Sequence, residues 1–146
     1  MHEMESEFVS ITLRAFPTEN SFKVICSVNL QDMAQNHSCR VENALIDTGA
    51  THTCISQEIA ELLHLSPIRS ELVSMADGYV SELPVYEIEM TISLGYNLPL
   101  EVYGLPVETQ ATQEVLIIGM DVISMGALHI ESTEDSIEGT LTFWVG

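Results

Sequence analysis

The sequence predicts a mostly β fold, a small closed barrel-like subunit with one or two short helices. Short segments in which apolar and polar residues alternate recur along the chain, and turn-forming residues separate them. Helix signals are confined to two short stretches near Ser56 and Asp121. The 146 residues contain no internal repeat or linker, so we expect a single domain over residues 1–146, with residues 1–7 as a frayed acidic start.

The first third of the chain reads as three strands. Residues 8–16 (FVSITLRAF) and residues 22–30 (FKVICSVNL) both alternate with period two, and a polar turn separates them. Residues 31–40 are polar and are expected to form a loop. Strand character returns at residues 41–46 (VENALI), so a strand is predicted to deliver Asp47 directly into a turn.

The middle of the chain predicts a short helix followed by a long hairpin. Ser56 is a good N-cap for an apolar helical face within residues 58–63, and Pro67 marks the end of that helix. Two extended segments then occupy residues 71–94 around the Ala-Asp-Gly of residues 76–78. Glycine after aspartate is a strong signal for a tight hairpin turn, so the tip is expected at residues 76–78.

A strand, a short apolar strand and a helical turn are predicted next. Residues 98–107 (LPLEVYGLPV) have strand character, and residues 115–118 form a fully apolar run that suits a buried strand. Residues 121–125 suit a helical turn that Gly126 ends. These elements complete the expected barrel before the last hairpin.

The chain is expected to close with one more hairpin. Its arms are residues 127–131 and residues 141–145 (LTFWV), and its turn is expected near Glu138 and Gly139. Trp144 lies in the second arm, where it could be internal or could anchor a subunit interface. The sequence does not choose between these two roles.

Composition excludes several classes of partner. Four Lys and Arg residues against 22 Asp and Glu residues give a formal charge of −18, which repels nucleic acid and anionic membrane surfaces alike. The acidic N-terminus lacks the pattern of a secretion signal, and no apolar run approaches the length that spans a bilayer. The three cysteines are few and odd in number, which argues against a disulfide framework. A cytoplasmic location is therefore expected, with no nucleic acid or membrane partner.

One short motif carries the chemistry. The triplet Asp47, Thr48 and Gly49 is weak by itself, because such a sequence also forms an ordinary polar turn after a strand. Here an apolar run precedes the triplet, an alanine follows it, and Ile-Ile-Gly at residues 117–119 precedes the second helix signal. This combination is far more specific than the triplet alone.

With these motifs the sequence resembles the retropepsin-like aspartic proteases over about residues 24–145. The resemblance implies that Asp47 is a catalytic carboxylate and that Thr48 and Gly49 hold its turn. It places Ala50 where many pepsin-like enzymes have serine, and it makes the hairpin at residues 76–78 a flap over the substrate. The site residues implied in this way are Asp47, Thr48 and Gly49 for catalysis, and Ala50, Ala76, Asp77 and Gly78 for substrate binding.

The resemblance also implies a homodimer. Peptide hydrolysis in this family needs two carboxylates that share one proton, yet the chain has a single Asp-Thr-Gly triplet. The second carboxylate is therefore expected from Asp47 of an identical subunit. The expected substrate is an extended polypeptide with apolar side chains flanking the cut, and neither a metal nor an organic cofactor is required.

Three other interpretations remain open at this stage. The chain could be a protease-fold dimer without catalysis that binds a peptide or a partner protein, because a fold does not establish an activity. Asp121 could be taken for a second catalytic acid, but no Thr-Gly follows it, and a helix-capping or structural role is favoured. Two His-x-Cys pairs could in principle bind zinc, although the alternative is ordinary core and loop packing. The pairs are His37 with Cys39 and His52 with Cys54.

Overall fold

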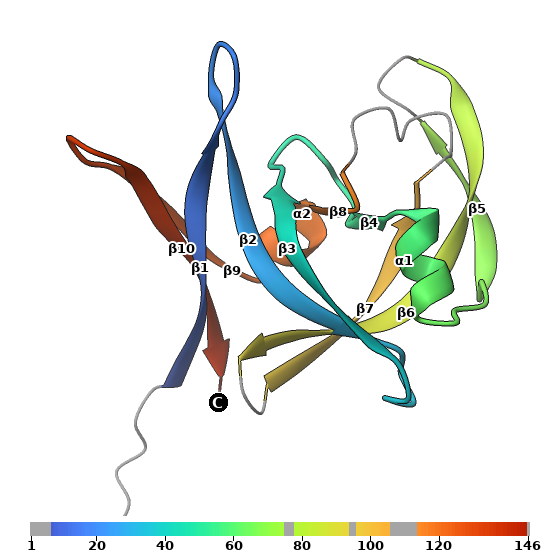
Figure 1. Cartoon of the computed structure of the whole chain (residues 1–146). Helices are drawn as coiled ribbons and strands as arrows, with labels where there is room; N and C mark the ends of the chain where they lie inside the picture. Colours follow the sequence, from blue (N-terminus) through green and yellow to red (C-terminus); the bar gives the residue numbers. More distant parts are fainter. Residues whose placement is uncertain (1–6, 75–77, 94–95, 106–113, 146) are drawn as a thin grey trace, which may run out of the picture.

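The computed structural model describes residues 7–74, 78–93, 96–105 and 114–145. Strands dominate, with two short helices, as the sequence predicts (Figure 1). The bounds are β1 Glu7–Pro17, β2 Phe22–Gln31, β3 Ser38–Ile46, β4 Cys54–Ile55, α1 Gln57–Leu62, β5 Arg69–Ser74, β6 Val80–Ser93, β7 Tyr96–Gly104, β8 Leu116–Ile118, α2 Met120–Ile123, β9 Gly126–Ser132 and β10 Ile137–Val145.

The described strands form one sheet that closes on itself. Their order is β5-β6-β7-β4-β8-β3-β2-β1-β10-β9, and β2 also pairs with β6. That extra pairing joins β6, β7, β4, β8, β3 and β2 into a closed ring, which satisfies the backbone groups that an open sheet would leave at its edges. Strand β5 lies outside the ring at one end, and β1, β10 and β9 continue from it at the other (Figure 1).

The first three strands form where the sequence predicts them, with one shift. Strand β3 begins at Ser38, earlier than expected, because Ser38 pairs with Gln31 of β2. The intervening loop is shortened by Asp32, whose Oδ1 accepts hydrogen bonds from the backbone N–H of Asn36 at 2.8 Å and of His37 at 2.9 Å. A polar segment therefore makes a tight turn and contributes its last residues to the strand.

Helix α1 begins as predicted, and one strand before it was missed. The Ser56 hydroxyl accepts a hydrogen bond from the Ile59 N–H at 3.2 Å, which is the expected N-cap interaction. Strand β4 immediately precedes it and has two residues, too few to show any periodicity in the sequence. The predicted hairpin is confirmed as β5 and β6. Of its tip, Gly78 has φ +88°, and Ala76 and Asp77 lie outside the described residues.

The predicted position of the last turn is wrong. Glu138 and Gly139 lie within β10, where Gly139 pairs with Ile130 of β9 and with Leu13 of β1. The turn comes earlier, at Thr133–Ser136, and the Thr133 hydroxyl donates to the Ser136 carbonyl at 3.0 Å. Gly139 has another function there: a Cβ at this position would collide with the carbonyl of His129 on the neighbouring strand.

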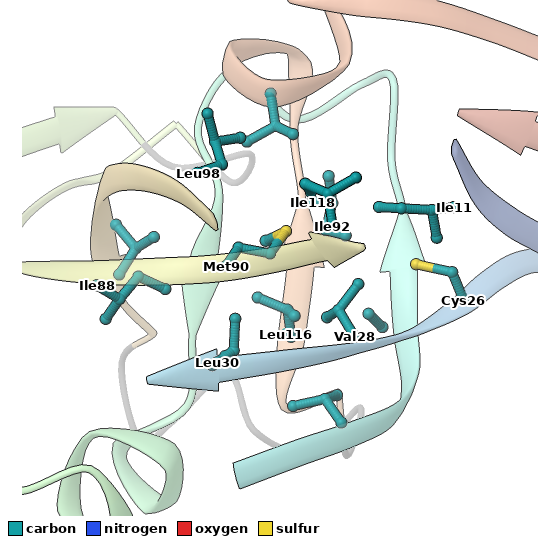
Figure 2. Packing of buried hydrophobic residues seen from close by; sticks show 14 of the residues in the cluster. Ile11, Cys26, Val28, Leu30, Ile88, Met90, Ile92, Leu98, Leu116 and Ile118 are labelled. Atoms are coloured by element: carbon teal, nitrogen blue, oxygen red, sulfur yellow. The ribbon is translucent and has the colours of Figure 1, made fainter. Parts of the chain in front are cut away.

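The core fills the inside of the closed ring and extends to β1, which contributes Ile11 (Figure 2). Along β6 the buried positions alternate, so that Ile88, Met90 and Ile92 point inward and meet side chains from β2 and β8. Burial of each such side chain stabilises the fold by about 1.5–3 kcal/mol. The labelled core residues of Figure 2 are Ile11, Cys26, Val28, Leu30, Ile88, Met90, Ile92, Leu98, Leu116 and Ile118.

Trp144 lies outside this core. Its side chain on β10 is 60% exposed and meets the ring of Phe8 edge to face, with the ring centroids 4.4 Å apart. The internal role that the sequence left open for Trp144 is therefore excluded. Neither helix in the described part of the chain has the length and apolar character required to cross a lipid bilayer.

Candidate active site

Asp47 is positioned by two strands that are distant in the sequence. Strands β3 and β8 run parallel, with Leu45 opposite Ile117 and Ile46 opposite Ile118. The ladder continues one step further, because the Asp47 N–H donates to the Ile118 carbonyl at 3.0 Å. The backbone of Asp47 is thus held by the core, while its side chain stands at the end of the sheet.

A tight turn then fixes the carboxylate. The Gly49 N–H donates to Asp47 Oδ1 at 2.9 Å, and the Ala50 N–H donates to the Asp47 carbonyl at 3.1 Å. A Cβ on Gly49 would lie 3.2 Å from Asp47 Oδ1, so glycine leaves room for this close approach. Asp47 is half-buried, whereas Thr48 and Gly49 are exposed. Within the described residues the Thr48 hydroxyl has no hydrogen-bond partner.

The start of α2 holds the rest of the loop. The Met120 N–H donates to the Ala50 carbonyl at 2.8 Å, and the Asp121 N–H donates to the Thr51 carbonyl at 3.1 Å. The helix can approach so closely because residue 119 is glycine: a Cβ there would lie 2.7 Å from the backbone carbon of His52. The Ile-Ile-Gly motif therefore supplies both the parallel strand and the close contact.

Asp121 has a structural role, as the sequence analysis favoured. Its Oδ2 accepts from the Thr53 N–H at 3.0 Å, and its Oδ1 accepts from the Thr53 hydroxyl at 2.7 Å. Thr53 is fully buried, and its hydroxyl oxygen accepts in turn from the Gly119 N–H at 3.1 Å. The two residues tie the loop of residues 47–53 to α2. No sequence signal links them, because they are far apart in the chain and belong to no common motif.

Replacing Asp121 by Asn is expected to lower the free energy of unfolding by about 2 kcal/mol. The new amide group would face the Thr53 donors with an N–H of its own, leaving buried hydrogen bonds unmade. Urea denaturation measures the effect. The same chemical change at Asp135, which is exposed in the last turn, should alter stability by less than about 0.5 kcal/mol. Equal stability of the two variants would contradict the role assigned to Asp121.

A cleft of about 750 Å³ opens beside the turn that follows Asp47. Gly49, Ala50 and His52 line it, together with Glu71 and Tyr103. Figure 1 shows the hairpin of β5 and β6 on the same side of the molecule as the loop between β3 and β4. Of the residues predicted to bind substrate, Ala50 therefore lines the cleft. Gly78 is exposed and is not among the lining residues, while Ala76 and Asp77 lie outside the described residues.

Comparisons with known proteins agree with this arrangement. A family model described as "gag-polyprotein putative aspartyl protease" matches residues 35–125, which include the turn at Asp47, the hairpin of β5 and β6, and α2. The chain belongs to this aspartyl protease family. A solved structure of a retropepsin-like aspartic protease from Rickettsia conorii is similar in fold, with a TM-score of 0.57, 12% sequence identity and coverage of 100% of both chains. No protein of curated function shows significant sequence similarity to the chain.

In this aspartyl protease family member, the predicted retropepsin-like fold is thus confirmed. Two of the residues that line the cleft, Glu71 and Tyr103, belong to a polar cluster that the sequence analysis missed. The Tyr103 hydroxyl donates to Glu71 Oε2 at 2.9 Å, and Arg69 Nη2 donates to the same oxygen at 3.1 Å and to Glu101 Oε1 at 2.5 Å. Burial raises the pKa of the Tyr103 hydroxyl, and the bond to Glu71 adds to this rise. The ring of His52 meets the ring of Tyr103 edge to face, with the centroids 4.6 Å apart, which links the cluster to the loop that follows Asp47.

The two His-x-Cys pairs of the sequence do not converge. His37 stacks on His64, with ring centroids 4.0 Å apart, while His52 lies in the cleft. Burial, with smaller contributions from nearby carboxylates, raises the pKa of the Cys54 thiol to about 11, so this thiol stays protonated near neutral pH. Within the described residues, no three His, Cys, Asp or Glu side chains lie close enough together to hold a metal ion.

Proposed function

We propose that this chain is an aspartic endopeptidase whose active site forms between two identical subunits. The observation that carries the proposal is the presentation of Asp47. Its backbone is fixed by the β3 and β8 ladder, its carboxylate is held by the Gly49 N–H at 2.9 Å, and a cleft opens beside its turn. A carboxylate that is rigidly held next to a substrate-sized groove is suited to general acid–base catalysis.

The exposed face of the turn supports the dimer. A single chain provides one Asp-Thr-Gly triplet, and a two-fold axis beside Asp47 would bring its copy close. Thr48 is exposed, and its hydroxyl has no hydrogen-bond partner in the described part of the chain. A contact from this hydroxyl to the backbone of the second subunit would fix the separation of the two turns. Gly49 leaves room for that approach.

The proposed reaction uses the two carboxylates in different protonation states. Two carboxylates about 3 Å apart cannot both ionise readily, so the pair shares one proton. The ionised Asp47 would accept a proton from a water molecule between them, and the protonated copy would donate to the carbonyl oxygen of the bond being cut. Within the described residues β5 pairs only with β6, so an extended polypeptide would add to its other edge.

The specific activity toward casein is expected to rise with protein concentration and to fall on dilution, because a monomer would hold only half of the catalytic pair. Casein hydrolysis over a dilution series, together with sedimentation analysis, measures both quantities. A constant specific activity from a strictly monomeric protein would contradict the proposal. A dimer that binds peptides but leaves casein and a set of varied peptides intact would favour the alternative, a protease-fold dimer without catalysis.

A further inference from the structure

Strand β5 contributes to the cleft a carboxylate that the proposed catalytic pair does not use. Along β5 the exposed and half-buried residues alternate, so that Glu71 and Val73 are half-buried while Ser70 and Leu72 are exposed. Glu71 lines the cleft that begins at Gly49. If the cleft holds the substrate, as the proposed function has it, Glu71 would lie beside a substrate residue near the cut.

The partners of Glu71 leave part of its charge unbalanced. Tyr103 and Arg69 both donate to its Oε2, and within the described residues its Oε1 has no hydrogen-bond partner. Arg69 is shared with Glu101, and the contact to Glu101 is the shorter one, at 2.5 Å against 3.1 Å. Two carboxylates therefore share one guanidinium group. The cluster of Glu71, Glu101 and Arg69 keeps a net negative charge next to the cleft.

The surroundings of Glu71 suit a long side chain with a cationic end. Leu83 and Leu105 line the same cleft, as does the ring of Tyr103. Lysine and arginine place their methylene groups along apolar surface while the charged end reaches a polar partner. An acidic side chain would not fit as well, because Arg69 is not among the lining residues and is already bound by two carboxylates.

The net negative charge of the whole chain also favours the binding of a cationic peptide. With 22 Asp and Glu residues against four Lys and Arg residues, the protein attracts cationic peptides and repels anionic ones. The long-range attraction is not specific, but it raises the local concentration of basic segments around the cleft. Glu71 then supplies a defined contact inside it.

We propose that Glu71 determines specificity by binding a lysine or arginine side chain of the substrate close to the bond that is cut. This inference rests on the proposed function, in that the cleft is taken as the substrate site. It refines the expectation of apolar side chains around the cut, since one position would accept a basic residue. The substrate class would then be extended, basic segments of polypeptide.

Binding of peptides to the Asp47→Asn chain tests this without any cleavage. The probes are two sets of fluorescent octapeptides that carry either lysine or norleucine at one position in turn. Norleucine has a straight apolar chain like that of lysine but no charge. We expect lysine to bind about fivefold more tightly at one position, a modest factor because the Glu71 side chain is 38% exposed. Adding Glu71→Gln should reduce this preference below about twofold.

Glu134→Gln is the matched control, because it removes a carboxylate from an exposed position in the last turn that does not line the cleft. In the Asp47→Asn chain, this change should leave the preference for lysine in place. No position with a lysine preference, or a preference that survives Glu71→Gln, overturns the inference. Failure of the proposed function shows itself separately, as the absence of cleavage by the chain with Asp47 intact, and the binding result stands in either case.

Discussion

Replacing Asp47 by Asn is expected to abolish the hydrolysis of casein while leaving the fold in place. The loss should be on the order of a thousandfold or more, because the amide can neither accept the proton of the attacking water nor share a proton with its copy. The structure predicts a folded variant, since the side-chain oxygen of the introduced asparagine can still accept the hydrogen bond from the Gly49 N–H. Casein hydrolysis and circular dichroism measure the two effects.

The control for this variant is Asp135→Asn, which makes the same chemical change in an exposed turn. It should retain full activity, so that the loss can be assigned to position 47 and not to a general change in charge. If the Asp47→Asn protein hydrolysed casein as fast as the unmutated protein, another acid or a contaminating protease would be responsible for the hydrolysis.

The Gly119→Ala variant is expected to lose about 3 kcal/mol of stability and, with it, most of its activity. The added Cβ would lie 2.7 Å from the backbone carbon of His52 and 2.9 Å from the Ala50 carbonyl oxygen. Both atoms belong to backbone, so the overlap can be relieved only if α2 and the active-site loop move apart. The hydrogen bond from the Met120 N–H to the Ala50 carbonyl would then be lost. Urea denaturation and casein hydrolysis report on both consequences.

Gly78→Ala provides the comparison, because it separates crowding from backbone conformation. Gly78 has φ +88°, which disfavours alanine, but within the described residues no atom lies within 4 Å of the place that an added Cβ would take. The expected loss is about 1 kcal/mol. If Gly119→Ala were as stable as the unmutated protein, the close contact between α2 and the loop could not be what positions Asp47.

Local patterns predicted most of the fold. The period-two segments became β1 and β2, the two extended segments around Gly78 became β5 and β6, and the Ser56 cap begins α1 as expected. Elements that depend on contacts between distant parts of the chain were harder to predict from the sequence. Strand β4 has two residues and exists because it pairs with β7 and β8. The last turn was misplaced because Gly139 serves a close approach of strands, which has the same sequence signal as a turn.

The candidate site also has parts that could be predicted from the sequence and parts that could not. The triplet that begins at Asp47 could be read from the sequence, because a short motif and its apolar flanks specify a strand and a turn. The bridge between Thr53 and Asp121 and the bond from Tyr103 to Glu71 could not, since each joins segments that only the folded sheet brings together. Polar residues on a strand look alike in the sequence whether they face solvent or a cleft.

Mixing the unmutated chain with an excess of the Asp47→Asn chain tests most directly whether one active site needs two copies of Asp47. After subunit exchange, the unmutated chains would be held in mixed dimers with a single carboxylate, and casein hydrolysis should fall toward zero as the excess grows. The same excess of the Asp135→Asn chain should instead increase hydrolysis. If hydrolysis stayed constant at every ratio of the Asp47→Asn chain, with exchange verified, each chain would act alone and the shared active site would be contradicted.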